Sequence, residues 1–242
     1  MTRTAHPHKG LDRLRRAQDH LRQVDPVLAR LIERRPDFDP HAWLDELPKM
    51  DLFGSLIFQV AGQQLSVAAT RKILERLAAL FGGRLPSPQE LLTVTPDDLR
   101  AAGFSWRKVA TLRDLAERFE DGRLDMKELE SLPDDEVIAA LTAVPGIGPW
   151  TAQGALLVAL RREDVVLPGD LALRKSIRSV YHLDHVPTQQ EVLDIAEKWR
   201  PFRSVATSYL FAAAVEPDAF GGPKRIARSR AATKRRAKSA AT

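Results

Sequence analysis

The sequence predicts an all-α protein. Apolar residues recur at helical spacing along nearly the whole chain, and no series of alternating apolar and polar residues predicts a sheet. Polar capping residues mark the beginnings of many of these stretches, and glycines mark several of their ends. With 242 residues, the chain is long enough to bury a substantial core as one large domain or two small lobes.

The amphipathic stretches define the expected helices in chain order. They cover residues 11–35, 52–61, 66–80, 106–119, 134–143, 150–160, 171–181, 191–199 and 203–215. Shorter helices are expected after two further starts, Ser87-Pro88-Gln89-Glu90 and Thr95-Pro96-Asp97-Asp98. The first of these starts is a predicted capping box, as is Thr188-Gln189-Gln190-Glu191. Left-handed helix ends are predicted at Gly82, Gly83, Gly103 and Gly122.

Composition excludes several classes of protein. The absence of cysteine rules out disulfides, thiolate zinc sites, cysteine nucleophiles and cysteine-ligated iron–sulfur clusters. No apolar run approaches the roughly 18 residues that would predict a membrane span. Residues 1–10 contain no apolar core of a signal peptide, so we expect a cytoplasmic protein with no membrane partner.

The net charge of +5 is unevenly distributed. Residues 221–242 carry eight basic side chains and no acidic one, whereas residues 1–220 hold 29 basic and 32 acidic residues. This tail has no aromatic residue and little that could form a core, so we expect it to be disordered. It either serves solubility as a solvated end or is attracted to a polyanion such as the DNA backbone.

The segment from Leu141 to Ala152 departs from simple helix packing. Pro145 ends one helix, Gly146 and Gly148 allow a tight turn, and Pro149 begins the next helix directly. Exposed main-chain amides at a helix N-terminus bind anions, so Gly146, Gly148 and Thr151 are predicted to bind a DNA phosphate. The alternative is an ordinary turn between two helices.

Asp170 is the candidate acidic residue. It lies 22 residues after Gly148, follows Pro168-Gly169, and directly precedes the predicted helix 171–181. It could simply cap that helix. Capping is also compatible with a catalytic role, because it would hold the carboxylate in place.

Two more segments carry motifs. The first is Gly62-Gln63-Gln64-Leu65-Ser66, and the second is Trp199-Arg200-Pro201-Phe202-Arg203-Ser204-Val205-Ala206. Together with the Pro-Gly-Ile-Gly hairpin and Asp170, they resemble the helix-hairpin-helix (HhH-GPD) superfamily, and within it the 3-methyladenine DNA glycosylase II branch. The resemblance covers roughly residues 50 to 215.

This resemblance implies two helical lobes with the helix-hairpin-helix and an active-site cleft between them. The expected division is an N-terminal helical segment, 1–51, that completes the second lobe; a lobe at 52–162 ending in the hairpin; a second lobe at 163–220 carrying Asp170; and the basic tail, 221–242. Bacterial relatives carry an additional N-terminal β domain, for which the residues before the match are too few and too helical. We therefore expect the compact form.

The resemblance also implies the chemistry. An extruded alkylated purine would lie against Trp150 and Phe211, while Gln64, or else Leu65, fills the gap left in the duplex. Asp170 would stabilise the oxocarbenium-like sugar and accept a proton from the attacking water. Superfamily members with lyase activity use a lysine where this sequence has Trp150, so a monofunctional glycosylase is expected.

No cofactor is expected for catalysis. The resemblance implies a structural K⁺ or Na⁺ on the main-chain carbonyls of Thr142, Val144 and Ile147. The expected partner is double-stranded DNA with alkylated bases, bound by a monomer and, in a bacterial-type cell, on the nucleoid. The alternatives are a non-enzymatic DNA-binding protein or a glycosylase for a deaminated or oxidised base. A binding module would have no need of a carboxylate at position 170.

Overall fold

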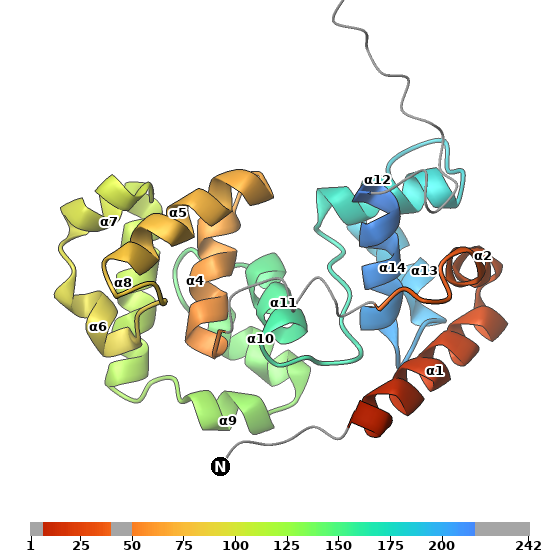
Figure 1. Ribbon diagram of the computed structural model, residues 1–242, viewed down its shortest axis with the longest axis horizontal. Coiled ribbons are helices and arrows are strands. Elements are labelled where there is room, and N and C mark those ends of the chain that lie inside the picture. The colour runs from red at the N-terminus through yellow and green to blue at the C-terminus, as the bar shows by residue number, and fades with distance from the viewer. Residues whose placement is uncertain (1–6, 40–49, 216–242) are drawn as a thin grey trace, which may run out of the picture.

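The computed structural model describes residues 7–39 and 50–215, and every regular element within them is an α-helix (Figure 1). The helices are α1 Pro7–Val24, α2 Pro26–Arg34, α4 Leu52–Gly62, α5 Val67–Ala79, α6 Pro88–Thr93, α7 Pro96–Ala102, α8 Trp106–Glu120, α9 Met126–Ser131, α10 Asp134–Thr142, α11 Pro149–Val158, α12 Leu171–Val180, α13 Gln189–Glu197 and α14 Arg203–Val215. The prediction of an all-α fold is confirmed. Residues 221–242, the predicted basic tail, lie outside the described residues.

The single helix predicted over residues 11–35 is wrong. The chain forms α1 and α2, separated at Asp25, because Pro26 has no main-chain N–H to continue the first helix and favours the first position of a new one. The Asp25 carboxylate accepts hydrogen bonds from the amides of Val27 and Leu28 and so caps α2. The short helix α9, capped by Asp125, was not predicted.

The predicted helix boundaries elsewhere are confirmed where capping chemistry sets them. Ser87 and Thr188 each form a complete capping box with the glutamate three residues later. Gly103 ends α7 with a φ of +113°, in the left-handed region that glycine adopts without steric cost.

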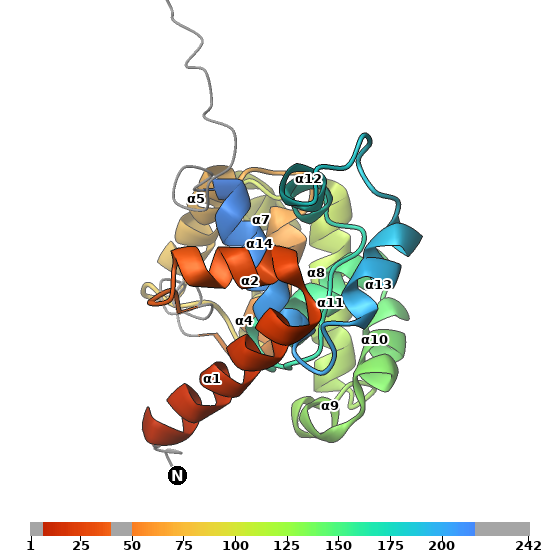
Figure 2. The same cartoon turned by 90° about the vertical axis from the view of Figure 1, so that its right-hand side faces the viewer.

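The helices form two groups. Contacts within the first group join α4 to α5, α8 and α11, and extend through α6, α7 and α10, whereas α12 packs along α14, which also contacts α1 and α2. Figure 1 shows the first group on the left and the second on the right, and Figure 2 views the second group from the front. The N-terminal helices thus lie beside the last helix of the described chain.

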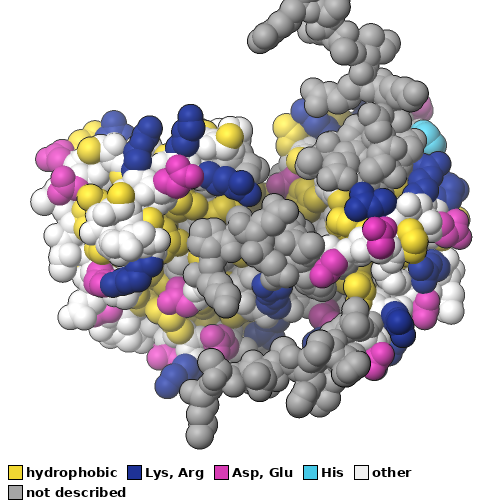
Figure 3. All heavy atoms as spheres, in the orientation of Figure 1, with side chains coloured by type: hydrophobic (Ala, Val, Ile, Leu, Met, Phe, Trp, Pro, Cys, Tyr) yellow, Lys and Arg dark blue, Asp and Glu magenta, His cyan; other side chains and the backbone are white. Residues whose placement is uncertain are grey.

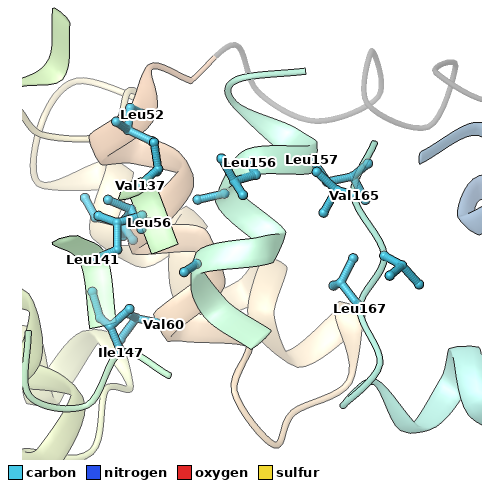
Figure 4. Packing of buried hydrophobic residues seen from close by; sticks show 14 of the residues in the cluster. Leu52, Leu56, Val60, Val137, Leu141, Ile147, Leu156, Leu157, Val165 and Leu167 are labelled. Atoms are coloured by element: carbon cyan, nitrogen blue, oxygen red, sulfur yellow. The ribbon is translucent and has the colours of Figure 1, made fainter. Parts of the chain in front are cut away.

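A short extended segment leads from α11 into the second group and packs on the core. Val165, Val166 and Leu167 are buried, and Figure 4 shows Leu157 of α11 directed toward Val165. Tyr209 and Trp199 are fully buried. Trp106 instead is 58% exposed at the first turn of α8.

Charged groups fix this connecting segment. Arg162 donates to the carbonyl oxygens of Glu130 and Leu132, each at 2.9 Å, and Asp164 accepts from Arg203 at 2.7 Å. An open pocket of about 590 Å³ adjoins them, lined largely by charged side chains. None of the predicted site residues lines this pocket, so we assign it to the junction of the two groups.

Within the described part of the chain, none of the helices combines the length and the apolar character that crossing a membrane requires.

Candidate active site

Asp170 has the position and the contacts of a fixed carboxylate. It is the N-cap of α12, where its Oδ1 accepts a hydrogen bond of 2.9 Å from the amide of Leu173. Its other oxygen, Oδ2, accepts one of 2.8 Å from the indole Nε1 of Trp150 on α11. The capping prediction is therefore confirmed. The bond from Trp150 was not predicted, because sequence spacing does not orient an indole across two helices.

The hairpin between α10 and α11 is built around Gly146. Its φ is +92°, and a Cβ at this position would lie 2.0 Å from Oγ1 of Thr111. That hydroxyl on α8 donates a hydrogen bond of 3.0 Å to the carbonyl of Pro145. Gly146 is therefore required both by its backbone conformation and by the close approach of α8.

The N-terminus of α11 lacks a side-chain cap. Gly148 is its N-cap and provides no side-chain hydrogen bond, unlike the serine caps of α5 and α8 and the aspartate cap of α12. Among the described residues, apart from its two chain neighbours, none has an atom within 4 Å of a Cβ built on Gly148. The first-turn amides are thus free to meet an anion, and no side chain at Gly148 would keep its backbone away.

Thr151 can contribute to such a site only through its main chain. Its side chain is 2% exposed, and its hydroxyl accepts a hydrogen bond of 3.1 Å from Nε2 of Gln63. The same amide nitrogen donates to the carbonyl of Gly146 at 3.0 Å. Through these two hydrogen bonds, Gln63 attaches the hairpin to the end of α4. The motif that contains Gln63 does not by itself predict this contact, because Gly146 in the hairpin lies 83 residues further along the chain.

The loop after α4 presents Gln64 and Leu65 at the surface. Gln64 is exposed and has a φ of +59°, uncommon for a residue with a side chain, and Leu65 is 44% exposed. Lys108 holds the loop by donating to the carbonyl oxygens of Ala61 at 2.8 Å and Gln63 at 3.0 Å. Partial burial lowers the pKa of this ammonium group. Leu65 is therefore not part of the core.

Phe211 lies on the other group of helices. It is half-buried on α14, the helix that packs along α12. Within the described residues no ring contact joins it to Trp150, whereas Trp150 contacts Asp170 directly. Arg174 on α12 donates a hydrogen bond to the carbonyl of Pro187.

The carbonyls proposed for a cation lie where α10 ends. Thr142 is its last residue, and helix C-termini expose unpaired carbonyl oxygens. The carbonyl of Val144 already accepts a hydrogen bond of 3.0 Å from the amide of Ile147, which leaves one lone pair. These oxygens suit a hard cation. Among the described residues, no cluster of His, Cys, Asp and Glu offers another metal site.

The surface of the first group of helices has features of a polyanion-binding face. Figure 3 shows Lys and Arg side chains along the upper edge of the half that holds α5 and α7, and a notch in the outline between the two halves. An uncapped helix N-terminus, an exposed loop and a fixed carboxylate therefore occur together on a helical scaffold. Such an arrangement can grip a phosphate and act on a neighbouring sugar.

The comparison with protein families decides the assignment. A model described as HhH-GPD superfamily base excision DNA repair protein matches residues 57–201. The chain belongs to this superfamily. The match includes the loop after α4, the helix-hairpin-helix and Asp170.

Relatives in the HhH-GPD superfamily cover most of this chain. DNA-3-methyladenine glycosylase 1 of Schizosaccharomyces pombe is 34% identical over 200 residues, which are 82% of this chain and 86% of that protein. DNA-3-methyladenine glycosylase 2 of Escherichia coli is 30% identical over 78% of this chain and 64% of its own length. The solved structure of Schizosaccharomyces pombe Mag1 with abasic DNA matches with a TM-score of 0.74 and 32% identity, over 83% of this chain and 97% of that one.

Proposed function

We propose that this HhH-GPD protein is a monofunctional DNA glycosylase that extrudes alkylated purines, of the 3-methyladenine and 7-methylguanine type, and hydrolyses the N-glycosidic bond. The hydrogen bond from Trp150 to Asp170 carries the proposal, because it places a carboxylate beside an aromatic ring. Two relatives of this chain are named DNA-3-methyladenine glycosylases, which supports the substrate class. Removal of the base would begin base excision repair.

The carboxylate of Asp170 would act on the sugar. As the bond between C1′ and the base nitrogen breaks, the electron pair goes to the base and positive charge develops on the sugar. An ionised carboxylate stabilises that charge and accepts a proton from the water that attacks C1′. The bonds from Leu173 and Trp150 hold both oxygens in place, so little reorganisation is needed.

The cationic base would need no strong acid to leave. Alkylation at N3 or N7 of a purine places a positive charge on the ring, and a cation is attracted to an aromatic face. Trp150 and Phe211 are the proposed walls of that pocket. A lyase step requires an amine that forms a Schiff base, and Trp150 stands where superfamily members with that activity carry lysine.

The uncapped start of α11 would grip the DNA backbone. The main-chain amides of Gly148, Trp150 and Thr151, with the close approach allowed by Gly146, form the proposed phosphate site. The carbonyls of Thr142, Val144 and Ile147 would hold a K⁺ or Na⁺ that adds positive charge beside that phosphate. Gln64 on its exposed loop would fill the space left in the duplex, with Leu65 next to it.

We also propose that the enzyme acts as a monomer on double-stranded DNA. The exposed large apolar side chains of the described residues are spread over separate elements rather than gathered in one patch: Leu65, Leu80, Trp106, Leu171 and Leu193.

Base release from methylated duplex DNA tests the proposal, with wild type compared with Asp170→Asn. Asparagine is as good an N-cap as aspartate, so the variant keeps α12 and its DNA binding but loses the negative charge. We expect release of 3-methyladenine and 7-methylguanine by wild type and a loss of at least a hundredfold in the variant. Equal release by both proteins, or release by neither, would overturn the proposal. Duplexes with hypoxanthine or 8-oxoguanine test the alternative lesions, and retention of DNA binding without any release would indicate a binding protein.

A further inference from the structure

Gln59 occupies the space that a side chain at position 154 would take. It lies on α4, and Gly154 lies on α11, which packs against α4. A Cβ on Gly154 would lie 2.6 Å from Cδ and Oε1 of Gln59 and 2.8 Å from its Nε2. The carboxamide of Gln59 therefore rests directly on the backbone of α11.

This carboxamide is almost buried but has no partner. Gln59 is 6% exposed, and within residues 7–39 and 50–215 no group forms a hydrogen bond with its amide. The fully enclosed side-chain atoms without a partner in this part of the chain are His20 Nε2 and Ser55 Oγ, so the Gln59 amide still touches open space. A buried amide without a partner costs folding free energy, which suggests that its partner is a ligand.

The carboxamide rests on the helix that also carries the contact to the proposed catalytic group. Gly154 follows Trp150 by one helical turn, and residues four apart on a helix have Cβ atoms about 5–6 Å from each other. The amide of Gln59 therefore lies on the face of α11 that carries the indole bonded to Asp170. A base attached to a sugar at Asp170 would extend along this face.

We infer that Gln59 forms hydrogen bonds with the Watson–Crick edge of the extruded purine, an inference that rests on the function proposed above. A carboxamide offers one donor and one acceptor side by side. With Nε2 toward O6 and Oε1 toward N1–H it matches a 7-alkylguanine, and turned over it matches the N1 and the exocyclic amine of a 3-alkyladenine. Gln59 is thus a specificity-determining residue for alkylpurines whose Watson–Crick edge is unmodified.

The test compares Gln59→Leu with a matched variant on the same helix, Ser55→Ala. Both remove a buried polar group without a partner, so both should keep or raise the melting temperature. Gln59→Leu should lower the single-turnover release of 7-methylguanine and of 3-methyladenine about tenfold or more, whereas Ser55→Ala should change neither. Affinity for a duplex with a tetrahydrofuran abasic analogue, which has no base to read, should stay within twofold.

A second variant keeps the carboxamide but moves it. Gly154→Ala places a methyl group where the amide lies, and the flexible glutamine must shift, so release should fall in the same way. If wild type releases the bases and Gln59→Leu releases them at the same rate, the proposed role of Gln59 is overturned. A fall in the melting temperature that accompanies the loss of release would also overturn it. No release by wild type would instead overturn the proposed function itself.

Discussion

Nε1 of Trp150 lies 2.8 Å from Oδ2 of Asp170 and joins the hairpin helix α11 to the N-terminus of α12. The two residues are 20 positions apart and belong to different groups of helices. Because α11 also carries the proposed phosphate site, this bond sets the distance between the DNA backbone and the carboxylate. Both the proposed phosphate binding and the position of the catalytic carboxylate therefore depend on α11.

Replacing Trp150 by phenylalanine should separate these roles. The ring remains, but Oδ2 of Asp170 loses its donor, and hydrogen bonds to charged groups contribute about 1.5–3 kcal/mol. We expect the single-turnover rate of 7-methylguanine release to fall roughly tenfold to a hundredfold, with little change in DNA affinity. Trp106→Phe is the control, since that indole is exposed at the start of α8 and should leave the rate unchanged. An unaltered rate in Trp150→Phe would show that the bond does not support catalysis.

Replacing Gln64 by glycine should raise stability and lower activity together. Glycine adopts a positive φ without steric cost, so relief of the left-handed conformation stabilises the fold by up to about 1 kcal/mol. The same change removes the proposed plug, so release from duplex DNA should fall while release from single-stranded DNA is unaffected. Melting temperature and release rates on the two substrates measure this. Equal losses on both substrates would contradict the role of a plug.

The two hairpin glycines should respond differently to alanine. In Gly146→Ala the new methyl group meets Thr111 and the φ of +92° is strained, so we expect a loss of about 2–4 kcal/mol in the free energy of unfolding. In Gly148→Ala nothing lies nearby, so stability should hold while DNA affinity falls, because the methyl group obstructs the phosphate. Denaturant unfolding and fluorescence anisotropy distinguish the two. Full DNA affinity in Gly148→Ala would exclude a phosphate at this helix start.

Much of this organisation could be predicted from local signals. The capping boxes at Ser87 and Thr188, the turn at Gly146 and the cap at Asp170 depend on residues within a few positions of one another. The amphipathic pattern alone does not predict the division of the N-terminal helix at Asp25, because the pattern continues through the break. Pro26 is the local signal for this division, because proline cannot continue the hydrogen bonding of the first helix.

The remaining features depend on contacts between distant segments. Gln63 forms a hydrogen bond with Gly146, which lies 83 residues further along the chain. Trp150 on α11 forms one with Asp170 at the start of α12. Gln59 and Gly154 become neighbours only when α4 packs on α11. No spacing in a single sequence encodes such pairs, so they could be found only in the folded chain.

Asp25 ties the N-terminal helices to the second group. Its side chain is fully buried and accepts hydrogen bonds from the Tyr181 hydroxyl and, at 2.8 Å, from the Trp199 indole, while Lys198 lies 3.1 Å away. Burial alone would raise the pKa of this carboxyl, but its hydrogen bonds outweigh that effect and hold the pKa below 3.8. Burial next to this carboxylate in turn raises the pKa of the Tyr181 hydroxyl above its usual range.

The Asp25 carboxylate should therefore stabilise the fold at neutral pH and lose that effect in acid. Its folded-state pKa is depressed, so its contribution is complete above pH 3.8, the ordinary value of the carboxyl, and declines as the pH falls through the lower folded value. We expect Asp25→Asn to lower the free energy of unfolding by about 3 kcal/mol at pH 7 and by less below pH 3.8. Urea unfolding across this pH range measures the difference. Asp51→Asn, an exposed cap with one amide partner, should cost less than about 1 kcal/mol at any pH. A difference between wild type and Asp25→Asn that stays constant with pH would show that the carboxylate charge does not stabilise this junction.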